Sequence, residues 1–148
     1  MKIALVAGGH LPIPPKGWGG VEHLIWNFHN QLKKIGDEVS IINTTSIDQI
    51  VKKLNSENFD AVHLHYDQYA NLMPHIKCNK KMVTSHYPYL ENPEPQYTFL
   101  YDLLNTSKSH IVCLSDRIKK EFLHRGSNST NVSAVSYTHL TLPTTLSV

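Results

Sequence analysis

The chain has 148 residues, which is enough for one domain with its own core and too few for two domains of ordinary size. Its 14 basic and 12 acidic residues give a formal net charge of +2, so the composition provides no strong attraction to nucleic acid or to an anionic membrane. Without a signal-peptide pattern or an apolar run of about 20 residues, the sequence predicts a cytoplasmic protein in which Cys78 and Cys113 are buried free thiols.

The first third of the chain contains two strand patterns on either side of one helix pattern. The run KIALVAGG, residues Lys2–Gly9, predicts a strand that is buried on both faces of a sheet. After a loop rich in proline and glycine, apolar residues at helical spacing from Val21 to Ile35 predict a helix, and Gly36 is placed to end it. The run EVSIINT, residues Glu38–Thr44, predicts the second strand.

The rest of the chain repeats this alternation. The predicted elements are, in order, a helix from the N-cap Ser46 to about Asn55, a strand at Phe59–Tyr66, a short helix at Asp67–His75, a strand at Lys81–Tyr87, a helix at Gln96–Asn105, a strand at His110–Ser115, a helix at Asp116–His124 and the start of a strand at Asn131–Val135. Strands that alternate with helices at this spacing predict an α/β fold with a doubly wound, parallel, Rossmann-like sheet.

The last fourteen residues differ from the rest of the chain in composition. Residues 135–148 contain none of the chain's Asp, Glu, Lys or Arg and show no helical period. The run VSYTHLTLPT resembles the translation of a transposon-end adapter that is used in preparing sequencing libraries. We therefore expect residues 1–134 to be a native, truncated domain and residues 135–148 to be a non-native tail derived from the adapter.

The segment PKGWGGVE, residues 15–22, joins the first strand to the first helix. Ligands of open α/β sheets bind beyond the carboxyl ends of the strands, and the free N–H groups at a helix start suit an anion or sugar oxygens. Gly19, Gly20 and Glu22 are therefore candidate substrate-binding residues. A plain loop whose glycines serve only turn geometry is the alternative. The glycine spacing does not fit the dinucleotide fingerprint, and there is no Walker motif.

Several of the ten histidines lie at predicted strand ends. His63 and His65 alternate with apolar residues, so both side chains should face the same side of the sheet. His65 is expected to meet His86 and His10 at the rim of the crevice and to contact a sugar there, although purely structural histidines remain an alternative. We expect no metal, because the sequence has no HxxxH helix and no cysteine near these histidines.

Three further candidate residues lie near the same rim. Ser115 follows the fifth predicted strand and is either a substrate contact or simply the N-cap of the next helix. Trp18 and Tyr66 have flat aromatic faces that suit sugar rings, whereas Trp26 is expected to pack against the protein. No GxSxG elbow occurs, which argues against a hydrolase.

Four segments in this order carry a family resemblance: the GGVE loop, VHLHY, VTSHYPY and IVCLSDRIKKEFL. They resemble the amino-terminal domain of retaining GT-B glycosyltransferases, of the family 4-like type, in bacterial glycan and lipopolysaccharide synthesis. The resemblance covers residues 1–134 and implies the amino-terminal half of a GT-B fold. It also implies that Gly19 and Gly20 approach the donor phosphates or the acceptor, and that His86 is the catalytic residue that contacts the transferred sugar.

The resemblance implies that the intact parent transfers a sugar from a nucleotide-sugar donor to a glycan, lipid or small-molecule acceptor. Transfer would proceed with retention and without metal or any cofactor besides the nucleotide-sugar substrate. The donor-binding carboxyl-terminal domain would be missing, so the fragment alone should be inactive. A peripheral membrane contact is compatible with this function, and nucleic acid is not an expected partner. A GT-B-type nucleotide-sugar epimerase and a non-enzymatic Rossmann-like binding module are the alternatives.

Overall fold

Six short apolar runs pair side by side into a parallel sheet in the order β2-β1-β3-β4-β5-β6. The computed structural model describes residues 1–86 and 95–135. The strands are β1 Lys2–Ala7, β2 Glu38–Asn43, β3 Ala61–Leu64, β4 Lys80–Ser85, β5 His110–Cys113 and β6 Val132–Ala134. The helices are α1 Gly20–Lys34, α2 Ile47–Ser56, α3 Pro95–Thr106 and α4 Asp116–His124, with 3₁₀ helices η1 Asp67–His75 and η3 Ser129–Asn131.

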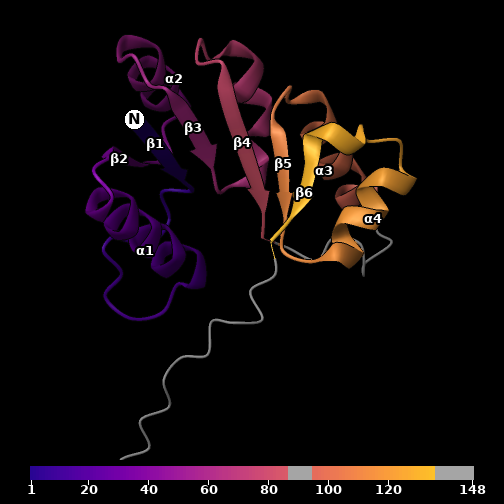
Figure 1. The fold of residues 1–148 in the computed structure, drawn as a ribbon, viewed down its shortest axis with the longest axis horizontal. Coiled ribbons are helices and arrows are strands. Elements are labelled where there is room, and N and C mark those ends of the chain that lie inside the picture. The colour runs from indigo at the N-terminus through magenta and orange to yellow at the C-terminus, as the bar shows by residue number, and fades with distance from the viewer. Residues whose placement is uncertain (87–94, 136–148) are drawn as a thin grey trace, which may run out of the picture.

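The strand order contains one reversal of direction. The chain passes from β1 through α1 to β2 on one side, and then returns past β1 to place β3 on its other side (Figure 1). From β3 onward each new strand is added at the same edge. The switch point therefore lies between β1 and β3, and the predicted doubly wound, parallel, Rossmann-like α/β sheet is confirmed.

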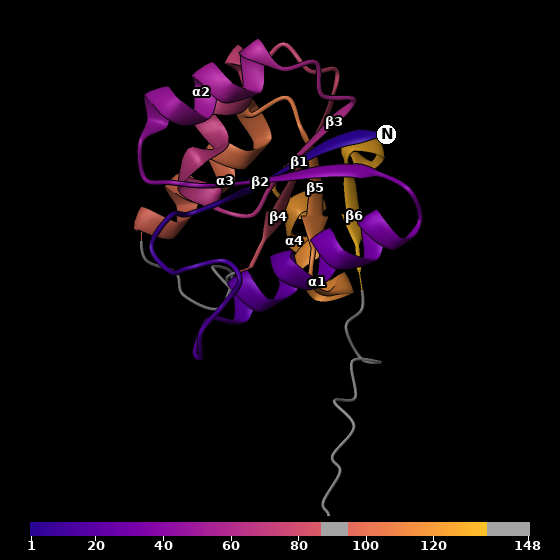
Figure 2. The same ribbon diagram turned by 90° about the vertical axis from the view of Figure 1, so that its left-hand side faces the viewer.

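The two faces of the sheet carry separate cores. One core joins β1, β3, β4 and β5 to α2, η1, α3 and α4, and its fully buried side chains include Ile50, Met73, Leu104 and Phe122. On the opposite face α1 packs against β1 and β2, with Ile25 completely buried (Figure 2). β1 contributes residues to both cores and must be apolar on both sides, which explains its continuous apolar run in the sequence.

The predicted helix signals are confirmed. The Ser46 Oγ accepts a hydrogen bond from the Gln49 N–H at 3.4 Å and so caps α2. Gly36 follows α1 with a φ of +97° and donates its N–H to the Lys33 carbonyl at 3.1 Å. Both features depend on local chemistry alone, which is why the sequence identifies them.

The strand ends are shorter than predicted. The predicted strand Phe59–Tyr66 is reduced to Ala61–Leu64, because the Phe59 N–H bonds locally to the Glu57 carbonyl and the β3–β4 pairing stops at Leu64. The predicted helix Asp67–His75 is a 3₁₀ helix that contains Pro74. Tyr87 and residues 136–148 lie outside the described residues, so the expectation about the adapter-derived tail stays a prediction.

Both cysteines are free, and they differ in burial. Cys113 is fully buried, and burial raises the pKa of its thiol to about 12. Cys78 is half-buried, with its Sγ 3.3 Å from the Phe59 carbonyl oxygen. Within the described ranges, none of the helices combines the length and the apolar character that crossing a membrane requires.

Candidate functional site

A cavity of about 350 Å³ lies at the carboxyl ends of β1 and β3, beside the start of α1. We call it the switch-point cavity, since ligands of open α/β sheets bind where the strand order reverses. Its lining residues are Gly8, His10, Leu11, Trp18, Gly19, Gly20, Val21, Glu22, His65 and Tyr66. They include neither lysine nor arginine, so besides the Glu22 carboxylate the wall offers aromatic rings and further hydrogen-bonding groups.

The loop after β1 is fastened to the end of β2. The Asn43 side chain accepts a hydrogen bond from the Gly9 N–H at 2.9 Å and donates one to the Leu11 carbonyl at 2.8 Å. Gly9 has a φ of +80°, and a Cβ there would lie 2.3 Å from the Thr44 carbonyl carbon. Glycine is therefore required at this position, both for the backbone conformation and for the close approach of the two loops.

The glycine pair before α1 has two different roles. Gly19 is the N-cap of α1 with a φ of +136°, and a Cβ there would lie 2.7 Å from Glu22 Oε2. A Cβ at Gly20 would meet no atom within 4 Å. The fold therefore needs glycine at 19, whereas a side chain at 20 would project into open space beside the cavity.

One of the two ring nitrogens of His65 has no hydrogen-bond partner among the described residues. Its side chain is buried, with 2% exposed, and its Nδ1 lies 3.1 Å from His86 Nε2 in a hydrogen bond. Its Nε2 has no partner among the described residues, although His65 lines the switch-point cavity. Leaving a buried polar group without a partner costs about 1–3 kcal/mol, so this nitrogen is where a ligand would be expected to bind.

His65 belongs to a row of three adjacent histidine rings on the α1 face of the sheet. Its ring centroid lies 4.0 Å from that of His63 and 5.4 Å from that of His86. His63 Nε2 forms a 2.6 Å hydrogen bond with Thr84 Oγ1. Phe28 of α1 lies against the rings of His63 and His65, with centroid distances of 6.1 and 5.9 Å. The prediction that His63 and His65 share one face is thus confirmed.

These three histidines are uncharged at neutral pH. Burial lowers the pKa of His63 and that of His86 to about 4, with the nearby His86 adding to the effect on His63. Burial also lowers the pKa of His65 well below its usual value, and His63 and His86 lower it further. The row can therefore donate and accept hydrogen bonds, but it cannot neutralise a phosphate group at pH 7.

The six predicted site residues do not all lie together. Four of them line the switch-point cavity: Gly19, Gly20, Glu22 and His65. His86 is not among the lining residues, and its Nε2 is hydrogen-bonded to Nδ1 of His65, which is one of them. Ser115 lies farther along the same edge of the sheet, after β5, where its Oγ accepts the Ile118 N–H at 3.3 Å as the N-cap of α4.

The aromatic residues occupy the positions that their sequence context suggests. Trp18 and Tyr66 line the cavity, and the Tyr66 hydroxyl lies 3.2 Å from His10 Nε2 in a hydrogen bond. Trp26 stacks on His29, with ring centroids 5.0 Å apart and an interplanar angle of 9°. In the part of the chain that the structure describes, no three His, Cys, Asp or Glu side chains are grouped to hold a metal ion.

Sequence reasoning missed several residues that build the site. Asn43 fixes the loop, Thr84 binds His63, and Phe28 covers the histidine row. Asn43 could have been found as a polar residue that ends an apolar strand beside the switch point. The partnership of Thr84 with His63 depends on β4 lying next to β3, which no local pattern reveals.

Comparisons with known proteins find a likeness among solved structures. No protein-family model matches the chain, and no curated protein matches it. Among solved structures, the chain is similar to AviGT4, a glycosyltransferase involved in avilamycin A biosynthesis, with 19% identity and a TM-score of 0.46. The match covers 58% of this chain and 32% of that one, so the chain spans about a third of the solved structure's length.

Proposed function

We propose that this chain is the acceptor-side, amino-terminal part of a GT-B glycosyltransferase that transfers a sugar from a nucleotide-sugar donor to a glycan, lipid or small-molecule acceptor. The observation that carries the proposal is the buried, unpaired Nε2 of His65, a residue that lines the switch-point cavity. A sugar hydroxyl can either donate to this nitrogen or accept from it, and so relieves the cost of leaving it unpaired.

The hydrogen bond between His65 and His86 makes the tautomer of one imidazole depend on that of the other. If His65 Nδ1 donates to His86, the Nε2 of His65 is an acceptor; if His86 donates, the Nε2 of His65 is a donor. His86 is the proposed catalytic residue, in contact with the transferred sugar. Its low pKa favours a neutral hydrogen-bonding role over that of a cationic acid.

The sheet edge offers a track for a substrate larger than one ring. His65, His86 and Ser115 follow the carboxyl ends of β3, β4 and β5, which are neighbours in the sheet. We propose Gly19, Gly20, Glu22 and His65 as substrate-binding residues at one end of this track. Ser115 is the proposed contact at the other end, in addition to its role as a cap.

The proposed reaction retains the anomeric configuration and needs no metal. A leaving nucleoside diphosphate requires fixed cations or N–H groups, and no lysine or arginine lines the switch-point cavity. We therefore assign most of this stabilisation to a second, carboxyl-terminal domain that binds the donor, outside residues 1–134. The N–H groups at the start of α1 would supply the remainder from this side of the cleft.

Recovering the genomic reading frame beyond codon 134 is the first test. The proposal expects a second Rossmann-like domain with a pair of glutamates, and a frame that ends soon after β6 would instead favour a binding module. The intact protein should then transfer labelled sugar to an acceptor, whereas conversion of the nucleotide sugar alone would favour an epimerase.

Variants of the intact protein test the assigned roles. His86→Ala should lower kcat by at least about a hundredfold, and Ser115→Ala should raise KM for a long acceptor. The exposed His124 provides a matched control, because His124→Ala removes an imidazole far from the switch-point cavity. The 148-residue chain alone should bind sugars without transferring them, and sugar-nucleotide turnover by it would contradict this part of the proposal.

A further inference from the structure

Trp18 is left in solvent at the switch-point cavity. Its side chain is 89% exposed, although a packed tryptophan buries roughly 150–250 Å² of surface. Trp26, the chain's other tryptophan, is half-buried and stacked on His29. The fold thus packs one indole and leaves the other beside a cavity that is lined by His65, the residue with the unpaired buried nitrogen.

The backbone on both sides of Trp18 is fixed to α1. His23 donates from its side-chain Nε2 to the Gly17 carbonyl at 2.8 Å, and its backbone N–H donates to the Gly19 carbonyl at 3.0 Å. One residue of the first turn of α1 therefore holds both neighbours of Trp18. The exposed indole is presented from an anchored segment, and a Cβ at the neighbouring Gly17 would meet no atom within 4 Å.

The remaining walls of the cavity suit the ring of a sugar. The rings of Tyr66 and His10 form one wall, with centroids 5.5 Å apart, and the lining residues Glu22 and His65 supply hydrogen-bonding groups. A pyranose has a face of C–H groups and an edge of hydroxyls. An indole matches the first and these polar groups match the second.

We infer that Trp18 is a positioning residue that covers a pyranose ring in the switch-point cavity, with its indole against the C–H face of the sugar. The hydroxyl edge then bonds to His65 Nε2 and to the Glu22 carboxylate. This inference rests on the proposed function and adds the means of ring recognition. The ring belongs either to the acceptor or to the nucleotide-sugar donor, and the probes below distinguish the two sources.

Tryptophan fluorescence of the full 148-residue chain tests the inference. In Trp26→Phe the emission comes from Trp18 alone, and in Trp18→Phe it comes from Trp26 alone. Each variant is titrated with methyl gluco-, galacto- and mannopyranosides, with UDP- and GDP-sugars, and with UDP and GDP. We expect a saturable change in emission in Trp26→Phe and none in Trp18→Phe.

Affinities measured by calorimetry separate recognition from folding. Trp18→Ala should weaken binding of the responding probe by about three- to tenfold, the loss that an aromatic contact predicts. Its thermal midpoint should stay unchanged, because an exposed indole has no packing to lose. Trp26→Ala is the matched control, and it should lower the thermal midpoint while leaving the affinity unchanged.

Each outcome decides one question. A response to methyl pyranosides supports the inference and assigns the bound ring to the acceptor. A response to nucleotide sugars, without one to UDP or GDP, supports it and assigns the ring to the donor. Equal affinities of the wild type and Trp18→Ala overturn the role of Trp18 and leave the proposed function intact. An equal response to the free nucleotides overturns the assignment of a sugar ring. If neither pyranosides nor nucleotide sugars bind, the proposed function fails as well.

Discussion

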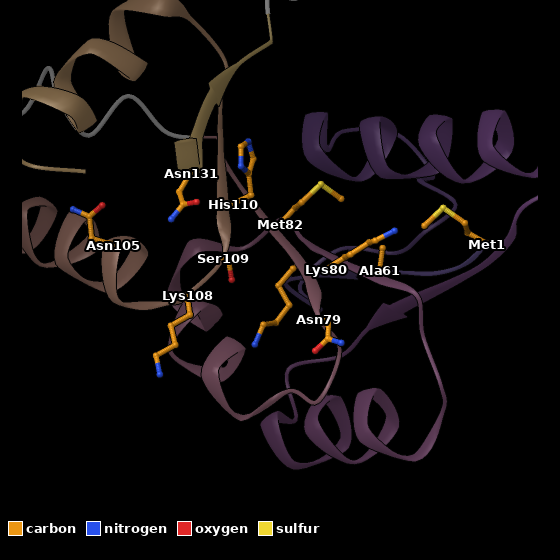
Figure 3. A pocket seen from close by; sticks show the side chains of 11 residues that line it. Met1, Ala61, Asn79, Lys80, Met82, Asn105, Lys108, Ser109, His110 and Asn131 are labelled. Atoms are coloured by element: carbon orange, nitrogen blue, oxygen red, sulfur yellow. The ribbon is translucent and has the colours of Figure 1, made fainter. Parts of the chain in front are cut away.

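The sheet has a hollow at each end, and the two differ in kind. The hollow at the amino ends of β3, β4 and β5 has a volume of about 760 Å³, twice that of the switch-point cavity. Figure 3 shows it spread between Asn105 and Lys108 on one side and Met1 on the other. The larger hollow has the weaker evidence for a ligand, so volume alone does not identify the site.

Hydrogen-bonding partners explain the difference. At the amino end, the Met1 amine bonds to Asp37 Oδ1, Lys81 Nζ bonds to the Met73 and Ile76 carbonyls, and His110 Nε2 bonds to Ser133 Oγ. At the carboxyl end, the buried Nε2 of His65 has no partner among the described residues. A group that folding has desolvated and left unpaired is a stronger sign of a ligand than an open space.

Lowering the pH should have the largest effect on the free energy of unfolding, because the buried histidines resist protonation in the folded state. In the unfolded chain the pKa of His63 and that of His86 return to about 6.5, whereas in the folded chain both lie at about 4. The unfolded state therefore binds more protons between these values, and folding stability is lost as the pH falls through this window. Each of the two histidines should account for about 2 kcal/mol between pH 7 and pH 5, measured by urea unfolding.

The double variant His63→Leu/Thr84→Val gives this prediction its control. It removes both partners of one hydrogen bond, so that neither is left buried and unpaired. Its unfolding free energy should depend less steeply on pH than that of the wild type. A stability that is the same at pH 7 and pH 5 would show that these histidines are not held neutral by burial.

A single added methyl group at Gly9 should disrupt the loop after β1. Gly9→Ala places a Cβ 2.3 Å from the Thr44 backbone at a φ of +80°, and the expected loss is roughly 2–4 kcal/mol of unfolding free energy. Gly17→Ala is the matched control, since a Cβ there meets nothing within 4 Å, and the expected change is within about 0.5 kcal/mol. Equal effects in urea unfolding would contradict the assigned role of Gly9.

Much of this fold follows from short-range patterns in the sequence. The apolar runs, the N-cap Ser46 and the terminator Gly36 each depend on neighbours within a few residues. The alternation of His63 and His65 with apolar residues places both on one face, because the side-chain period of a strand is two. These features are visible without knowing which strands are neighbours.

The site depends on contacts that no local pattern contains. The His65–His86 bond joins residues 21 positions apart, and the bond from Asn43 to Leu11 spans 32 positions. Which nitrogen of His65 is left unpaired follows only from those partners. The sequence predicted candidates at the carboxyl edge of the sheet, but it could not separate the four that line the cavity from Ser115, which caps a helix.

The smallest expected change in unfolding free energy concerns Lys108 at the amino end of the sheet, where substitution by glycine should stabilise the protein. Lys108 is exposed and has a φ of +54°, which is unfavourable for a residue with a Cβ. Lys108→Gly should therefore stabilise the protein by about 0.5–1 kcal/mol. Lys120→Gly, an exposed position inside α4, should instead destabilise it by about 1 kcal/mol, so the two identical substitutions should shift urea unfolding in opposite directions.

If the amino-end hollow is not a ligand site, Lys108→Gly should also leave the calorimetric response to pyrophosphate and to methyl pyranosides unchanged. Loss of a pyrophosphate response that the wild type shows would make the larger hollow an anion site and remove the contrast between the two ends.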